Sequence, residues 1–254
     1  MSNKAVLITG ASKRIGRAVA LACARAGYHV AIHYSRSGKE AATLASSLEA
    51  LGVKAICVQA DLSLETETKS LIAAASSALG TPMTALVNNA SVFLEDDWDS
   101  AENETLWNTH FAVNLRAPYI LSRALAKQIP PDQQGAIVNL VDQRVWRLNP
   151  TFFSYTLSKS AFWTMTRTLA QALAPMVRVN GVGPGPVLQS IHQDQAVFAH
   201  EADNTPLRQS VEPDEVAQAC LYLLTAKKVT GQMIAVDSGQ HLSWRTPDVE
   251  GPSL

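Results

Sequence analysis

The sequence predicts one α/β domain built on a doubly wound parallel sheet of about seven strands. Seven short apolar runs alternate with longer segments of helical pattern, which is typical of right-handed strand–helix–strand units. The runs are apolar throughout rather than at every second position, as expected of strands that helices cover on both faces. No linker rich in Pro, Gly or Ser divides the chain, so residues 1–254 are expected to form a single domain.

The predicted strands and helices alternate along the chain. The strands are expected at 5–9, 29–34, 54–60, 84–90, 135–141, 177–182 and 232–237. The helices are expected at 15–26, 38–51, 64–79, 102–128, 154–174 and 213–225. Segment 183–212 has no clear pattern, and we expect an irregular substrate loop there, since long loops in compact domains often bind ligands. Residues 245–254 are expected to be poorly ordered or to take part in subunit contacts.

Composition narrows the class of protein. A formal net charge of -1 gives no electrostatic reason to expect a nucleic acid or a membrane surface as partner. The first apolar run has only about five residues, too few for a signal-peptide core or a membrane span. The 3 cysteines are far apart, and no Cys/His group has metal-ligand spacing. We expect free thiols, a cytoplasmic location and no metal site.

Ligands of such sheets bind beyond the carboxyl ends of the strands. After the first strand comes TGASKRIG, in which Gly10 and Gly16 frame a tight turn into a helix. Gly10 permits close approach of the backbone, Gly16 allows tight packing, and the helix N-terminus offers amides to a pyrophosphate. Arg14 stands where a middle glycine is common and adds a cation. The pattern predicts a Rossmann-type dinucleotide site, with an ordinary strand–helix turn as the alternative.

The end of the second strand indicates which dinucleotide is bound. An NAD site usually has an acidic residue there for the ribose hydroxyls. This chain has Ser35, Arg36 and Ser37, and its first acid is Glu40. Two hydroxyls and a guanidinium suit a 2′-phosphate, and Lys13 can add charge from the first turn. We therefore predict NADPH; a solvated polar loop is the alternative.

Tyr155 and Lys159 lie four residues apart on one predicted helix and share a face. A nearby ammonium is expected to lower the pKa of the phenol, because opposite charge favours the ionised form. A tyrosine tuned in this way can pass a proton near neutral pH. Asp142 follows the fifth strand and Asn114 lies in the preceding helix, which makes a chance occurrence of the Tyr-x-x-x-Lys pattern a less attractive explanation.

Asp142 stands where a ketone-reducing enzyme would want a neutral hydrogen-bond donor. An ionised carboxylate cannot donate, and it repels a developing alkoxide. A ring C=N instead needs a proton delivered to nitrogen, which a carboxyl group beside a tyrosine can serve. The sequence would be the same whether Asp142 is a neutral carboxyl group or an ionised one that orients Tyr155, so both protonation states stay open.

These motifs resemble those of the short-chain dehydrogenase/reductases over nearly the whole chain: TGASKRIG, DLS, NNAS, Asn114, YTLSK and VRVNGVGPGPV. The chain is more narrowly similar to the pteridine reductases and the bacterial dihydromonapterin reductases. Arg14, HYSRS, NNASVF and Asp142 carry that narrower resemblance. It implies an NADPH-dependent homotetramer that reduces a pteridine, such as dihydrobiopterin or dihydromonapterin, to the tetrahydro form.

The resemblance also implies roles for individual residues. Asp142, Tyr155 and Lys159 would act on the substrate, with Asn114 supporting a water chain. Phe93 would lie against the pterin ring, with Arg14 and Ser91 near cofactor and substrate. The cofactor contacts are expected at Gly10, Lys13, Arg14, Ile15, Gly16, Ser35, Arg36, Ser37, Asp61, Leu62, Asn88, Ala90, Tyr155, Lys159, Pro184, Gly185 and Val187.

Several alternatives stay open on the sequence. Phe93, Phe152 and Trp146 fit the pocket or ordinary packing equally well. The run GPGPVL lacks the threonine that commonly follows Pro-Gly in the wider family, and so departs from the family pattern at the expected nicotinamide contacts. The same fold and cofactor would serve a general carbonyl reductase. A non-catalytic NADPH-binding regulator would have no need of Tyr155 and Lys159.

Overall fold

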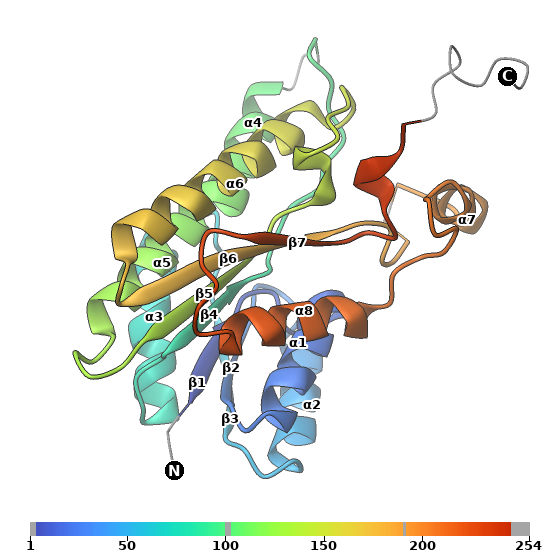
Figure 1. Ribbon diagram of the computed structural model, residues 1–254. Coiled ribbons are helices and arrows are strands. Elements are labelled where there is room, and N and C mark those ends of the chain that lie inside the picture. Colours follow the sequence, from blue (N-terminus) through green and yellow to red (C-terminus); the bar gives the residue numbers. More distant parts are fainter. Residues whose placement is uncertain (1–3, 100–102, 190–191, 245–254) are drawn as a thin grey trace, which may run out of the picture.

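The computed structural model describes residues 4–99, 103–189 and 192–244. Its centre is a seven-stranded sheet in the order β3-β2-β1-β4-β5-β6-β7, and every neighbouring pair is parallel (Figure 1). The strands are β1 (Ala5–Ile8), β2 (His29–Tyr34), β3 (Ala55–Gln59), β4 (Ala85–Asn88), β5 (Gly135–Leu140), β6 (Val177–Pro184) and β7 (Met233–Val236). The predicted doubly wound parallel sheet is confirmed.

Helices cover both faces of this sheet (Figure 1). One face packs against α1 (Arg14–Arg25), α2 (Gly38–Glu49) and α8 (Pro213–Thr225). The other packs against α3 (Glu65–Leu79), α5 (Ala117–Gln128) and α6 (Phe153–Leu173), with α4 (Asn103–Phe111) beside α6. All four residues of β1 are fully buried between the two layers. Burial of Val6, Leu7 and Ile8 contributes roughly 1.5–3 kcal/mol for each side chain.

Most predicted boundaries agree with the structure to within two residues, but two expectations need correction. The predicted helix 102–128 contains a π-helical segment, Ala112–Arg116, between α4 and α5, while residue 102 lies outside the described chain. The predicted irregular loop 183–212 contains a helix, α7 (Gln195–Asp203). Asp194 begins α7, because its side chain accepts a 2.8 Å hydrogen bond from the Val197 amide. The expectation for residues 245–254 falls outside the described residues.

The strand order places the site. From β1 the chain adds β2 and β3 on one side of the sheet, and it then adds β4 to β7 on the other side. In open parallel sheets, ligands bind in the crevice that this change of side leaves beyond the carboxyl ends of the strands. Short 3-10 helices, Gln143–Val145 after β5 and Gln240–Leu242 after β7, border the same end of the sheet. The turns after β1, β4, β5, β6 and β7 therefore meet in one place.

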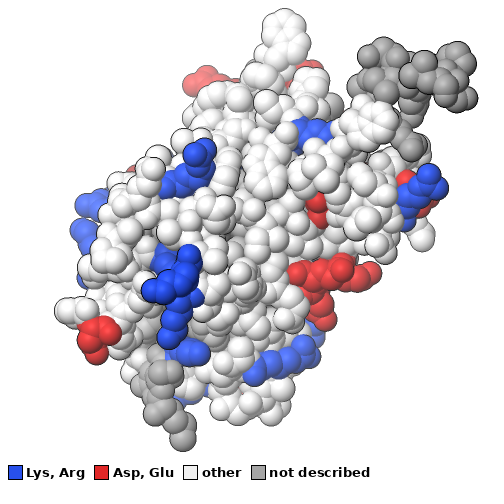
Figure 2. All heavy atoms as spheres, in the orientation of Figure 1, with Lys and Arg blue, Asp and Glu red and all other residues white. Residues whose placement is uncertain are grey.

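No helix in the described part of the chain is long and apolar enough to cross a bilayer. Within 4–99, 103–189 and 192–244, no group of His, Cys, Asp or Glu has the arrangement of a metal site. All three cysteines are free thiols, with Cys23 and Cys220 buried. On the face shown in Figure 2, basic and acidic side chains lie in small separate groups.

Candidate active site

The turn after β1 is packed too tightly for side chains at its two glycines. A Cβ atom on Gly16 would lie 2.4 Å from the Gly10 carbonyl oxygen and 2.7 Å from Asn89 Nδ2. Gly10 has φ +61 and would place a Cβ atom 3.1 Å from Ala90 Cα. Asn89 closes the contact, since its Nδ2 donates to the carbonyls of Thr9 and Gly10 at 2.8 and 3.1 Å. The predicted roles of both glycines in a close turn agree with this geometry.

Arg14 begins α1 in a left-handed conformation, with φ 53. This backbone is strained for a residue with a Cβ atom, which explains why glycine would suit the position. The guanidinium donates 3.0 Å hydrogen bonds to the carbonyls of Leu188 and Gln189, beyond β6. Arg14 therefore joins the first turn to the segment that was predicted as the substrate loop, a contact that sequence spacing did not indicate.

The residues after β2 lie on the surface rather than inside the central cavity. Ser35 and Arg36 are exposed, and Ser37 precedes α2. Lys13 forms a 2.6 Å ion pair with Glu40, and both side chains are about half exposed. Arg36 and Lys13 thus place cations near the start of α2. Their assignment to a 2′-phosphate stays a prediction.

The predicted contacts after β3 and β4 are mostly engaged within the protein. Asp61 Oδ1 accepts from the Ser63 amide and hydroxyl at 2.9 and 2.7 Å, which lowers the pKa of the Asp61 carboxyl. Leu62 is buried in the core. Asn88 Nδ2 donates to Asn139 Oδ1 at 2.8 Å, which ties β4 to β5. These side chains support the floor of the crevice, and direct cofactor contacts from them stay predictions.

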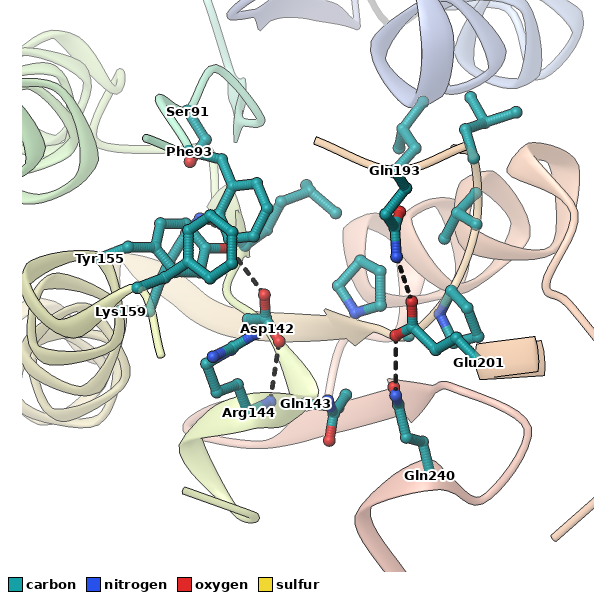
Figure 3. Close-up of a pocket in the computed structure, with 18 of the residues that line it drawn as sticks. Ser91, Phe93, Asp142, Gln143, Arg144, Tyr155, Lys159, Gln193, Glu201 and Gln240 are labelled. Carbon is teal, nitrogen blue, oxygen red and sulfur yellow. Dashed lines mark hydrogen bonds between the residues drawn. The ribbon is translucent and has the colours of Figure 1, made fainter. Parts of the chain in front are cut away.

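A cavity of about 510 Å³ lies at the ends of β5 and β6 (Figure 3). It brings together ten of the predicted site residues: Arg14, Ile15, Ser91, Phe93, Asp142, Tyr155, Lys159, Pro184, Gly185 and Val187. The remaining predicted residues do not line it: Gly10, Lys13, Gly16, Ser35, Arg36, Ser37, Asp61, Leu62, Asn88, Ala90 and Asn114. Phe152 lines the cavity, whereas Trp146 packs outside it against Trp163 and His241.

Asp142 and Tyr155 form the polar centre of this cavity. The Tyr155 hydroxyl donates a 2.6 Å hydrogen bond to Asp142 Oδ2, and the Arg144 amide donates to Oδ1 at 2.8 Å (Figure 3). Both carboxylate oxygens therefore act as acceptors. The 3-10 turn Gln143–Val145 fixes the carboxylate, because Asp142 is its N-terminal cap.

The predicted lowering of the Tyr155 pKa was wrong. Burial raises the pKa of the Tyr155 phenol well above its usual value, and the charge and hydrogen bond of Asp142 raise it further. The nearby Arg144 opposes this rise. Four-residue spacing does bring Lys159 onto the same helix face, but its Nζ atom lies 5.7 Å from the centre of the Tyr155 ring. Tyr155 consequently retains its proton at neutral pH.

Lys159 is almost fully buried at 3% exposure. Its Nζ atom donates a 2.8 Å hydrogen bond to the Leu140 carbonyl at the end of β5. Burial lowers the pKa of the Lys159 ammonium to about 8, although the Asp142 charge opposes this shift. A lysine with such a pKa titrates close to physiological pH.

Asn114 lies in the π-helical segment and binds two neighbouring elements with its side chain. Its Oδ1 accepts from the Val92 amide and the Ser91 hydroxyl at 2.9 and 3.0 Å. Its Nδ2 donates to the Val92 carbonyl and to Ser158 Oγ at 3.0 and 3.2 Å. The amide therefore holds the loop after β4 against α6, next to Tyr155. A role in a water chain stays a prediction.

Aromatic rings form one wall of the cavity. Phe93 stacks on Phe152 with ring centres 4.0 Å apart and meets the Tyr155 ring at 73° and 4.7 Å. His192 lies edge-on to both phenylalanines, and its Nε2 contacts the Phe93 carbonyl at 3.1 Å. Phe152, with φ 53, immediately precedes α6. This wall suits a flat heteroaromatic ring, while the contact of Phe93 with a pterin stays a prediction.

The residues on the opposite side of the cavity were not predicted from the sequence. Gln193, Glu201 and Gln240 line it together with apolar residues of α7 (Figure 3). They come from three segments whose meeting depends on the position of α7. Asp194 is a residue type that often caps a helix, so the start of α7 could have been predicted from the sequence. A predicted helix there would have made Glu201 a candidate pocket residue.

A nicotinamide dinucleotide fits the residues present. The first helical turn of α1 has no side-chain cap and no acidic residue, so its amides can meet a phosphate. The Gly10–Gly16 turn keeps the backbone free of side chains at this point. Gly185 allows close packing as well, because a Cβ atom there would lie 2.6 Å from Asp237 Cα. The cavity then continues from Arg14 and Ile15 to Tyr155 and Lys159.

Comparison with known proteins establishes the family. The family model described as Enoyl-(Acyl carrier protein) reductase matches residues 10–241. The 3-oxoacyl-(acyl-carrier-protein) reductase FabG of Staphylococcus epidermidis is 30% identical over 245 residues, which span 94% of this chain and 100% of that protein. The uncharacterized oxidoreductase YmfI of Bacillus subtilis is 34% identical over 250 residues, 94% and 99% of the two chains. The chain belongs to the short-chain dehydrogenase/reductase family, and it is an oxidoreductase.

Two solved structures are closer in sequence than these relatives. FolM alternative dihydrofolate reductase 1 from Brucella canis, complexed with NADP, is 45% identical and has a TM-score of 0.91, with 98% of each chain covered. The Brucella suis protein of the same name, also with NADP, is 45% identical with a TM-score of 0.91. That alignment covers 98% of this chain and 100% of the Brucella suis protein.

Proposed function

We propose that this protein uses NADPH to reduce a pteridine, converting a dihydropterin such as dihydrobiopterin or dihydromonapterin to its tetrahydro form. The observation that carries the proposal is the Asp142 carboxylate, held 2.6 Å from the Tyr155 hydroxyl inside the cavity. A flat aromatic wall beside this pair suits a bicyclic heteroaromatic ring. Shape and charge therefore favour the same class of substrate.

The charge of Asp142 distinguishes a ring C=N from a ketone. Reduction of a ketone builds negative charge on oxygen, which a carboxylate repels and a neutral donor would stabilise. Reduction of a C=N bond adds a proton to nitrogen, and a neighbouring carboxylate stabilises the protonated nitrogen. Asp142 thus disfavours one transition state and favours the other.

Similarity to the two FolM proteins supports the proposal. At 45% identity they are closer to this chain than FabG at 30%, and both FolM structures contain NADP. Their names assign them to dihydrofolate reduction, which is also hydride transfer to a pteridine ring. FabG-type ketoacyl reduction is the second candidate, because relatives of that type also span the whole chain.

The residues assigned to the cofactor fit NADPH. The turn with Gly10 and Gly16 would hold the pyrophosphate, and Arg36 with its neighbouring serines would hold the 2′-phosphate. Lys159 would bind the ribose nearest the reacting ring. When bound, the reduced nicotinamide supplies the hydride.

The proton comes from the chain's own residues. Tyr155 holds its proton because burial and Asp142 raise its pKa. Asp142 accepts the hydrogen bond from that hydroxyl, so the proton lies toward Asp142 Oδ2 and would turn to the ring nitrogen when the substrate is bound. Tyr155 then donates the proton to the ring nitrogen, while Lys159 offsets the negative charge left on the tyrosine. Homotetramer formation and a cytoplasmic location stay predictions from the resemblance and the composition.

NADPH oxidation tests the proposal. The purified chain should oxidise NADPH with dihydrobiopterin or dihydromonapterin, with tetrahydropterin as product. Tyr155→Phe should lower kcat by about 100-fold or more, since it removes the proton donor. Absence of turnover with every pteridine, together with rapid reduction of a ketoacyl substrate, would favour the second candidate.

A further inference from the structure

Glu201 places a carboxylate on the side of the cavity that faces the Asp142–Tyr155 pair (Figure 3). It lies on α7, and Val197, Phe198 and Glu201 together turn one face of that helix toward the cavity. The reaction described above needs no acid there. The side chain is therefore a polar feature of the substrate pocket that the proposed chemistry leaves unexplained.

Two neutral carboxamides hold this carboxylate in place. Gln193 Nε2 donates to Glu201 Oε2 at 2.7 Å, and Gln240 Nε2 donates to Oε1 at 2.9 Å. Among the ion pairs of the described residues, none includes Glu201. The two amides orient the group and bring no opposite charge of their own, so Glu201 places a carboxylate in the wall of a cavity that Arg14, Arg144 and Lys159 also line.

We propose that Glu201 determines specificity by excluding pteridines with an anionic tail. This inference rests on the proposed function. In the binding mode that we propose, the ring lies near Phe93 with its reacting bond at Tyr155, and its substituent extends toward the wall that α7 forms. A neutral hydroxylated side chain can donate hydrogen bonds to Glu201. The benzoyl-glutamate tail of a folate carries two carboxylates, which would approach the carboxylate of Glu201.

The electrostatic effect is large enough to measure. Like charges on Glu201 and on the substrate tail repel each other more strongly in a cavity than in bulk water, and salt screens part of that repulsion. The hydrogen bonds between neutral hydroxyls and a carboxylate act in the opposite direction. Together these terms predict that kcat/KM favours dihydrobiopterin over dihydrofolate.

Glu201→Gln tests the inference with little change in shape, because a glutamine can rotate its amide to keep one of the two acceptor contacts. The quantity to measure is the ratio of kcat/KM for dihydrofolate to kcat/KM for dihydrobiopterin. We expect this ratio to rise about tenfold in E201Q, the effect of losing a partly screened repulsion. Raising salt from about 0.01 M to about 1 M should raise the ratio in the wild type and leave it unchanged in E201Q.

Glu49→Gln is the matched control, because Glu49 is an exposed residue at the end of α2 and the substitution removes the same charge. E49Q should keep the wild-type ratio and its salt dependence. A folded E201Q, checked by thermal unfolding, whose ratio stays within about twofold of the wild type would overturn the inference. Failure of the wild type to reduce any pteridine would instead refute the proposed function, and the inference with it.

Discussion

At the scale of single residues, the site depends on the protonation of two buried groups, Tyr155 and Lys159, beside the half-buried carboxylate of Asp142. Tyr155 donates to Asp142 at 2.6 Å, and burial together with that carboxylate raises the Tyr155 pKa. Lys159 contacts the Leu140 carbonyl, and its pKa is lowered by burial to about 8. At neutral pH the phenol and the ammonium are therefore both protonated, as proton donation requires.

The pH dependence of kcat/KM should report Lys159. Because kcat/KM follows ionisation of the free enzyme, it should decline as pH rises through about 8, where the Lys159 ammonium loses its proton. The fall should reach about tenfold per pH unit, and Tyr155 should not contribute, since its pKa is raised well above 10.0. The measurement is a pH profile with dihydrobiopterin.

Lys159→Arg serves as the control for that profile. An arginine stays charged across the accessible pH range, so the variant should lose the alkaline decline even where its activity is lower. An unchanged decline in Lys159→Arg would assign the titration to another group.

Residue types in the site could be predicted, but their ionisation could not. Tyr155 and Lys159 are four apart in the sequence, and Asp142 follows a recognisable strand, so their proximity follows from local geometry. The pKa of Tyr155 depends instead on burial and on a carboxylate brought in by the fold. For that reason the predicted direction was wrong.

At the scale of elements, His33 links the strand ends that support the first turn. It lies in β2, accepts a 3.0 Å hydrogen bond from the Gly10 amide at Nδ1 and contacts the Ala60 carbonyl at 3.0 Å with Nε2. Nε2 therefore carries the proton, and the ring is neutral. Burial lowers the His33 pKa to about 4. Protonation of Nδ1 would break the bond that positions Gly10.

Stability should fall in mildly acidic solution because of His33. Its pKa is about 6.5 when unfolded and about 4 when folded, so the unfolded chain binds more protons between these values. The stabilisation is present above pH 6.5 and is lost as pH falls toward 4. Urea unfolding at a series of pH values measures it.

His33→Gln isolates this contribution, since glutamine is neutral throughout and the other histidines are unchanged. The variant should show a shallower loss of unfolding free energy over this pH interval than the wild type. Identical slopes for the two proteins would show that His33 does not titrate as inferred.

Helices could be predicted where the hydrophobic pattern and the capping residues agree with the tertiary structure. The helix 213–225 was predicted at the observed bounds, and its start has Glu212 and Glu215 in a capping box. The π-helical segment Ala112–Arg116 has no comparable signature. Helix α7 was missed because its short apolar pattern lies within a segment rich in polar residues, although Asp194 caps it.

At the scale of the whole molecule, strand order determines which residues meet. The order β3-β2-β1-β4-β5-β6-β7 brings the turns after five strands to one end of the sheet. Alternating strands and helices predicted this arrangement, because parallel sheets with right-handed crossovers allow few topologies. The side of the cavity formed by α7 depends on long-range packing instead, and Glu201 was accordingly not predicted.

We propose that Asp142 adapts the short-chain dehydrogenase/reductase fold to the reduction of a pteridine. Asp142→Ser tests it most directly, because serine keeps a hydroxyl near Tyr155 while removing the charge. NADPH oxidation should be measured for wild type and variant, with dihydrobiopterin and with a 3-ketoacyl substrate. We predict that the variant loses about 100-fold in kcat/KM for the pteridine and gains activity on the ketone. Unchanged pteridine reduction, with no gain on the ketone, would contradict it.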